Sequence, residues 1–191
     1  MIQIGKRILL LFLVGVILVS GCTDTNTSKE TVDIAVVKQG DDVRVDYSGE
    51  LEDGTVFDTS IEDVAIEAGI YNPNREYKPL EFTVGAGQMI KGFDSGVVGM
   101  GVGENKTLII PPEEAYGPYI EELVKTIPVE DLENVGITPI VGAKVFTGQG
   151  QIATIIHVTD TEVVLDFNNM LAGKTLVFKI ELVSIEQDQE V

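Results

Sequence analysis

Hydrophobic and polar residues alternate along residues 41–48 and again along residues 176–183. A period of two residues is typical of a strand with one face in the core and the other in water. Residues 56–58, 80–84 and 104–110 are shorter apolar stretches bounded by turn residues. We expect strands at all five places.

Glycine and proline mark the connections between these strands. Residues 52–55 have Asp-Gly at their centre and predict a hairpin turn. Residues 91–98 carry apolar side chains four positions apart, which predicts a short helix that ends at Gly99. Residues 60–79 are long for a simple connection, and we expect an extended loop there.

Residues 118–167 interrupt this order with elements of their own. Apolar runs at residues 143–146, 151–158 and 162–167 predict strands, and residues 128–132 are turn-like. About fifty residues are far too many for an ordinary loop. The stretch is therefore expected to form a small β-rich subdomain inserted into the first domain.

The first residues of the chain are typical of a secretory signal. Basic residues precede an apolar run over residues 8–19, and small residues follow it. The run is shorter than the roughly 20 residues needed to cross a bilayer. Residues 19–22 resemble a lipobox, in which Cys22 carries lipid as the first residue of the mature chain; an uncleaved N-terminal anchor is the alternative. We expect a signal segment over residues 1–21, an anchor and flexible tether over residues 22–39, and a domain held outside the cytoplasm.

The acidic composition narrows the range of partners. Lys and Arg together number 13 against 31 Asp and Glu, a formal net charge of −18. Removal of the segment before Cys22 takes away Lys6 and Arg7 and no acid, so the charge becomes −20. This excludes nucleic acid, whose phosphates require basic residues. Glycosylation sequons begin at Asn26 and Asn105, and their use stays open.

The lone cysteine and lone histidine limit the chemistry further. One cysteine forbids an internal disulfide, so core packing must stabilise the domain. His157 has no cysteine or histidine near it in the sequence, which argues against zinc. Residues 85–87 and 99–103 are glycine-rich but complete no nucleotide-binding fingerprint. We expect no metal and no cofactor.

Four short motifs bring aromatic and hydroxyl side chains together. Residues 87–93 read Gly-Gln-Met-Ile-Lys-Gly-Phe, and residues 111–117 read Pro-Pro-Glu-Glu-Ala-Tyr-Gly. Residues 45–49 and 55–59 add a tyrosine, a phenylalanine and one carboxylate. In this order the motifs resemble the FKBP-type peptidyl-prolyl isomerases, and the resemblance runs from about residue 40 to residue 185.

The resemblance implies an α+β fold, in which a strongly curved antiparallel sheet wraps one short helix. The isomerase domain would be discontinuous, formed by residues 40–117 and 168–186. Residues 118–167 would be an inserted β-rich subdomain in the flap over the active site. The SlyD-like and archaeal long-type members carry such an insert, and there it recognises unfolded chains.

The resemblance also implies the site residues. Catalytic positions fall on Tyr47, Phe57, Asp58 and Tyr116, and substrate-binding positions on Leu80, Phe82, Met89, Ile90, Phe93, Met170, Leu171 and Phe178. Phe93 would form the floor beneath the proline ring, where many members have tryptophan. The Ile90 amide and the Tyr116 hydroxyl would bind substrate carbonyls, while Asp58 would orient Tyr47.

These expectations lead to one leading hypothesis and two alternatives. The leading one is a monomeric, membrane-tethered isomerase that acts on unfolded or proline-containing client proteins outside the cytoplasm. The second is a holdase that binds proline segments with little catalysis. The third is a solute-capturing lipoprotein, which we disfavour because one compact domain lacks the two-lobed clamp of such proteins.

Overall fold

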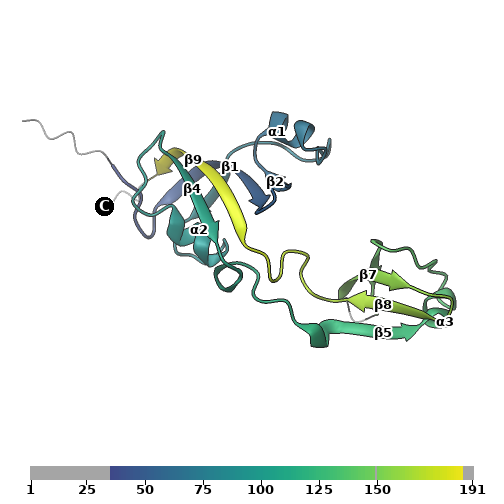
Figure 1. Ribbon diagram of the computed structural model, residues 1–191. Coiled ribbons are helices and arrows are strands. Elements are labelled where there is room, and N and C mark those ends of the chain that lie inside the picture. Colours follow the sequence, from purple (N-terminus) through teal and green to yellow (C-terminus); the bar gives the residue numbers. More distant parts are fainter. Residues whose placement is uncertain (1–34, 149, 187–191) are drawn as a thin grey trace, which may run out of the picture. The chain divides into compact units, whose positions relative to one another are not determined.

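The structure is a computed structural model that describes residues 35–148 and 150–186 (Figure 1). The predictions for the signal segment, for Cys22, for Asn26 and for most of the tether fall on residues 1–34 and lie outside the described residues. Within the described part of the chain, no helix has the length and apolar character needed to span a bilayer.

The first sheet is antiparallel throughout. Its strands are β1 (Asp42–Leu51), β2 (Val56–Thr59), β3 (Leu80–Thr83), β4 (Asn105–Ile110) and β9 (Leu176–Glu186). They lie in the order β2-β1-β9-β4, and β3 also pairs with β1. β2 pairs with the second half of β1 and β3 with the first half, so one long strand organises most of the sheet.

The short helix α2 (Lys91–Gly96) packs on this sheet and contributes Phe93 to its core. Two glycines permit the close approach. A Cβ atom on Gly92 would lie 2.4 Å from Cγ2 of Ile110, and one on Gly96 would lie 2.4 Å from Cδ1 of Leu108, both in β4. A curved antiparallel sheet around a short helix confirms the predicted α+β class (Figure 1).

The structure differs from the prediction at two places in this domain. Residues 60–79 are more than a loop, since they contain the helix α1 (Glu62–Glu67), whose Ala65 is fully buried. The predicted tether also ends too late. Val36 bridges to Gly101, and Val37 is buried in the core with its amide donating to the Met100 carbonyl at 2.9 Å. The fold therefore includes residues that precede the predicted start at residue 40.

A second antiparallel sheet is formed by chain between β4 and β9. It comprises β5 (Val124–Pro128), β6 (Lys144–Phe146), β7 (Ile152–Val158) and β8 (Glu162–Asp166), in the order β5-β8-β7-β6. The short helix α3 (Val129–Glu133) follows β5. The second sheet and α3 together form a separate buried cluster, which consists of Leu132, Val145, Ala153, Ile155, Val163 and Leu165. β6, β7 and β8 confirm predicted strands. β5 was not predicted, and α3 stands where the sequence predicted a turn.

The chain that enters this second sheet is tied to the chain that leaves it. The side-chain amide of Asn168 accepts from the Ile120 amide at 3.0 Å and donates to the Ile120 carbonyl at 2.9 Å. Closer to the first sheet, the Gly173 amide donates to the Gly117 carbonyl at 2.8 Å. Two 3-10 turns, η1 (Pro112–Glu114) and η2 (Glu121–Leu123), lie along the entering chain.

Candidate active site

A cavity of about 560 Å³ lies within the first domain, where α2 begins. Its walls are mostly apolar or aromatic and come from β1, β2, β3, β9 and the turn after β4. They comprise Tyr47, Phe57, Asp58, Leu80, Gln88, Met89, Ile90, Lys91, Phe93, Ala115, Tyr116 and Phe178. All four residues predicted to be catalytic are among them, with five of the eight predicted to bind substrate.

The remaining three predicted binding residues do not line this cavity. Phe82 is buried in the core beneath Phe93, with ring centroids 5.8 Å apart, because its strand points it inward. Leu171 packs against the same core cluster from its edge. Met170 has 71 % of its surface exposed and does not belong to that cluster. The aromatic wall is therefore complete without the residues around position 170.

Gly49 has no side chain, and this allows two aromatic rings of the cavity wall to meet. Gly49 of β1 lies opposite Phe178 of β9, and a Cβ atom at Gly49 would be 2.8 Å from the rings of both Phe178 and Phe57. Without it those two rings meet edge to face at 5.6 Å and 87°. Edge-to-face pairs of this kind are favourable beyond the area they bury.

Phe93 forms the floor of the cavity. Only 3 % of its surface is exposed, and its ring lies 5.1 Å from that of Phe178 and 6.1 Å from that of Tyr47, both near perpendicular. Tyr116 stands at the rim with 44 % of its surface exposed, so its hydroxyl is accessible to a bound peptide. Phe93, the predicted floor, is the least exposed of the residues that line the cavity, and its place beneath a proline ring stays a prediction.

Three polar side chains form a closed cluster at one side of the cavity. The Tyr47 hydroxyl donates to Oδ2 of Asp58 at 2.6 Å, and Nη1 of Arg75 donates to Oδ1 of the same carboxylate. Nη2 of Arg75 donates to the Tyr47 hydroxyl at 3.1 Å. Burial raises the pKa of Tyr47 to about 12, and the hydrogen bond to Asp58 contributes to the rise. The hydrogen bond to Asp58 also raises the pKa of the Arg75 guanidinium.

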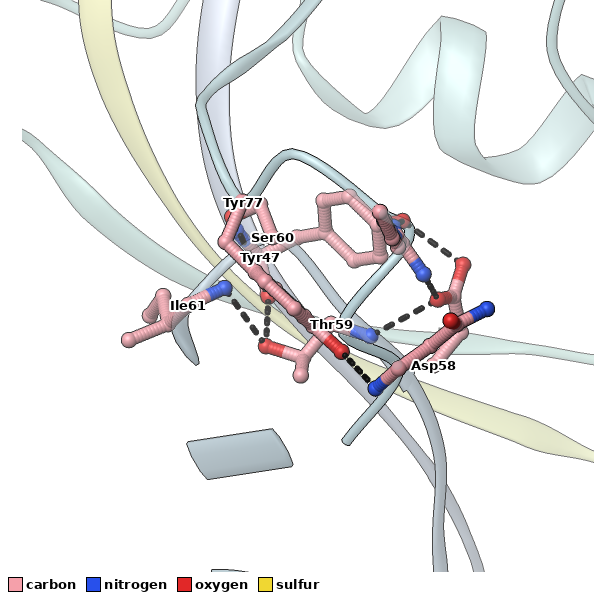
Figure 2. Close-up of polar contacts among 8 residues, drawn as sticks. Tyr47, Asp58, Thr59, Ser60, Ile61 and Tyr77 are labelled. Carbon is pink, nitrogen blue, oxygen red and sulfur yellow. Dashed lines mark hydrogen bonds and ion pairs between the residues drawn. The ribbon is translucent and has the colours of Figure 1, made fainter. Parts of the chain in front are cut away.

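Buried hydroxyl groups anchor this cluster to the sheet (Figure 2). Thr59 donates from Oγ1 to the Tyr47 carbonyl at 2.7 Å, and Ser60 accepts from the Tyr47 amide at 2.9 Å. The Ser60 hydroxyl also donates to Oδ1 of Asp46 at 2.8 Å. Because Thr59 and Ser60 directly follow Asp58, they hold the end of β2 against β1 and fix the spacing between Asp58 and Tyr47.

Arg75 is the member of this polar cluster that the sequence did not reveal. It lies in the segment predicted to be a plain loop, 17 positions after Asp58. No periodicity or motif marks a single arginine in such a segment. Its position beside the carboxylate depends on how α1 and the following turns return the chain to β3, which is a tertiary property.

The arrangement favours binding over acid–base chemistry. The Asp58 carboxylate accepts hydrogen bonds from three donors, the Tyr47 hydroxyl, the Thr59 amide and the Arg75 guanidinium, so it is not poised to remove a proton. Among residues 35–148 and 150–186, no three His, Cys, Asp or Glu side chains are grouped so that they could hold a metal ion. What the cavity offers is a largely aromatic surface with the Tyr116 hydroxyl at its rim, suited to an uncharged group such as a proline ring.

Comparison with known proteins identifies this type of site. Residues 35–183 match the FKBP-type peptidyl-prolyl cis-trans isomerase family. The chain belongs to that family, and it is a peptidyl-prolyl cis-trans isomerase.

Its relatives come from archaea, bacteria and eukaryotes. The short-type peptidyl-prolyl cis-trans isomerase of Methanocaldococcus jannaschii is 48 % identical over 153 residues, which cover 80 % of this chain and 96 % of the relative. The isomerase SlyD of Helicobacter pylori is 34 % identical over 125 residues, 63 % of this chain and 66 % of the relative. FK506-binding protein 2 of Yarrowia lipolytica is 36 % identical over 123 residues, which cover 58 % of this chain and 76 % of the relative. The archaeal relative is named short-type, whereas the sequence resemblance suggested the long type.

Proposed function

We propose that this isomerase acts on X–Pro bonds of unfolded or partly folded proteins outside the cytoplasm, and that residues 118–167 hold those clients. The observation that carries the proposal is the aromatic cavity closed at one side by Tyr47, Asp58 and Arg75. Such a cavity presents an aromatic wall and a fixed carboxylate to a proline ring and its flanking backbone.

The chemistry requires a surface that prefers the twisted amide. The barrier to rotation, about 18–20 kcal/mol, arises from amide resonance, and X–Pro bonds populate both isomers in unfolded chains. Twisting weakens the resonance and reduces charge separation, so an apolar wall that excludes water stabilises the transition state more than the ground state. Phe93 and Phe57 would supply that wall, and the exposed Tyr116 would bind a substrate carbonyl through its hydroxyl.

Removal of the polar groups should affect catalysis in a graded way. Asp58→Ala leaves the Tyr47 hydroxyl and the Arg75 guanidinium without their shared acceptor, and we expect kcat/KM on a short X–Pro peptide to fall about tenfold or more. Tyr116→Phe keeps the ring and loses one hydroxyl, so a loss of about two- to tenfold is expected. The measurement is a protease-free isomerisation assay on the protein without residues 1–34, the predicted signal segment and most of the predicted tether. Two folded variants with wild-type rates would show that the site lies elsewhere.

The second sheet supports the proposed role in holding clients. Phe146 of β6 pairs with Ile152 of β7, and these side chains are 69 % and 51 % exposed. β6 lies at the edge of the sheet, so its outer backbone groups face away from any partner strand among the described residues. An exposed apolar pair at a strand edge is a surface that can take up an unfolded segment.

The same exposed surface favours one alternative, a holdase with little catalysis. A wild-type rate no higher than the uncatalysed one, with aggregation of an unfolded protein still suppressed, would identify that function. The peptide assay therefore separates the two proposals. In either case we propose a monomer without nucleic-acid partners, since the chain carries a formal charge of −18.

The anchor is a separate proposal that rests on the sequence alone. We expect Cys22 to become the lipid-bearing first residue of the mature chain, with the membrane as partner. Replacing Cys22 with Ser should prevent processing, so intact mass should show residues 1–21 retained in the variant and absent from the wild type, which should also carry added lipid mass. One acyl chain gives only reversible membrane binding, whereas two give stable anchoring. The same uncleaved N-terminus in both proteins would remove the lipoprotein proposal.

A further inference from the structure

Arg75 needs a means of positioning that its hydrogen bonds alone do not provide. It lies between α1 and β3, outside any helix or strand, and its side chain is partly exposed. A free arginine side chain loses much rotamer entropy when it is ordered. Because Nη1 binds Asp58 and Nη2 binds Tyr47, both contacts are lost if the guanidinium swings into water.

Tyr77, one of a pair of stacked tyrosines, contacts this guanidinium with its ring. Cζ of Arg75 lies 5.4 Å from the centre of the Tyr77 ring, within the range of a cation–π contact. The Tyr71 ring stacks on the Tyr77 ring, with centroids 5.6 Å apart and planes inclined by 14°. Tyr77 is drawn beside the polar cluster in Figure 2.

The loop that carries the stack is closed by its own hydrogen bonds. The Asn72 amide donates to the Tyr77 hydroxyl at 3.0 Å, and the Arg75 amide donates to the Asn72 carbonyl at 3.1 Å. Asn72 also accepts at Oδ1 from the Asn74 amide at 3.0 Å. The two rings and the arginine are therefore set by one local structure, which leads directly into β3 and the cavity wall at Leu80.

Burial does not account for the stack. Tyr71 is 44 % exposed, and neither tyrosine belongs to the two buried clusters formed by the described residues. The contact that the inner ring makes is with a cation, and that cation contacts two residues of the cavity wall. We propose that Tyr77, backed by Tyr71, is a positioning residue for the isomerase reaction: its ring holds the guanidinium of Arg75 where it binds Asp58 and Tyr47. This inference rests on the isomerase activity of the site.

The test is a double-mutant cycle on the full chain, with kcat/KM measured on an X–Pro tetrapeptide. Tyr77→Leu removes the aromatic face, and we expect a loss of about three- to fivefold. Tyr77→Phe keeps the ring but loses the hydroxyl that accepts from the Asn72 amide, so we expect a loss smaller than that of Tyr77→Leu, within about twofold of wild type. Combined with Arg75→Ala, Tyr77→Leu should cause no further loss, because Tyr77 acts only through Arg75.

Two further variants serve as a second test and as a control. Tyr71→Ala removes only the outer ring and should cause a smaller loss of the same kind, which keeps the proposal testable if Tyr77→Leu folds poorly. Ile66→Ala, on an exposed position of α1 in the same segment, should have the wild-type rate. The proposed role of Tyr77 would be overturned if Tyr77→Leu still lowered the rate in the Arg75→Ala background. It would also be overturned if Tyr77→Leu alone had the wild-type rate. Neither result would affect the proposed isomerase activity. A wild-type rate equal to the uncatalysed one would instead overturn the isomerase activity and this role with it.

Discussion

Phe93→Ala is expected to destabilise the protein by about 3–5 kcal/mol, the range found when a large buried aromatic is truncated. The floor ring is almost fully buried and contacts the rings of Tyr47, Phe82 and Phe178. Its removal leaves a cavity beneath the substrate site and frees the walls to collapse into it. Isomerase activity should therefore fall even at temperatures where the variant stays folded. Urea unfolding and the tetrapeptide assay measure the two effects.

The same substitution on the second sheet provides a matched control. Phe146 is mostly exposed, so Phe146→Ala should change the free energy of unfolding by no more than about 0.5 kcal/mol. Its tetrapeptide activity should equal that of the wild type, because Phe146 is not among the residues that line the cavity. A Phe93→Ala protein as stable and as active as Phe146→Ala would show that Phe93 is not the floor of the site.

Alternation predicted the long strands of the first sheet because each of them has one face in the core. β1 and β9 pair with each other along nearly their whole length, and each has neighbours on both sides. The alternate residues Val43, Val45 and Tyr47 of β1 and Leu176, Phe178, Ile180 and Leu182 of β9 are buried and apolar, although Asp41 just before β1 is buried as well. The cavity residues followed because they lie on these strands or at their ends. Tyr47 and Phe178 are inward positions of an unambiguous pattern.

The sequence did not predict α1, β5 or the position of Arg75, because each of them depends on tertiary contacts rather than on a local pattern of apolar residues. α1 has six residues and no side-chain cap at Ile61, and its apolar residues Val64, Ala65 and Ile66 are consecutive rather than periodic. β5 is a short edge strand that ends in Pro128, and only its pairing with β8 makes it a strand. Arg75 depends on the same kind of long-range placement, since its partners are on β1 and β2.

The family resemblance went further than pattern, although three of the substrate-binding positions that it implied do not line the cavity. Positions near residue 170 were carried over as substrate contacts, yet Met170 is exposed and Leu171 packs on the core. The return segment from the second sheet is tied to the entering chain through Asn168 and Gly173, and these ties set its course. A motif assigns such residues correctly only when the connection around them has the same length and bonding.

Replacing residues 118–167 with a short turn should separate two activities. The two core clusters share no residue, and the cluster of the first domain contains none from this segment. The ends are already close, since the Gly173 amide donates to the Gly117 carbonyl at 2.8 Å. We therefore expect the shortened protein to fold and to keep its tetrapeptide kcat/KM within about threefold, because the cavity residues all remain.

Catalysis of protein refolding should respond very differently to the same deletion. A tetrapeptide needs only the cavity, whereas a folding protein must also present its prolines at the cavity repeatedly before they are buried. A second binding surface on the same chain raises their effective concentration, a gain on the order of a hundredfold or more. Loss of that surface should lower the rate of proline-limited refolding by about this factor and should abolish suppression of aggregation. Refolding of a denatured protein with a slow prolyl phase measures the first effect, and light scattering the second.

A variant that keeps the segment but changes its surface identifies which part is responsible. Phe146→Ala combined with Ile152→Ala removes the exposed apolar pair across β6 and β7 and leaves the buried cluster of the second sheet intact. If clients bind that pair, the double variant should lose refolding activity in the same direction as the deletion while its tetrapeptide rate stays unchanged. Equal losses in both assays after the deletion would mean that the cavity itself depends on the segment. No loss in either assay would leave the segment only a protective role at the sheet edge, and the proposed division of labour would be wrong.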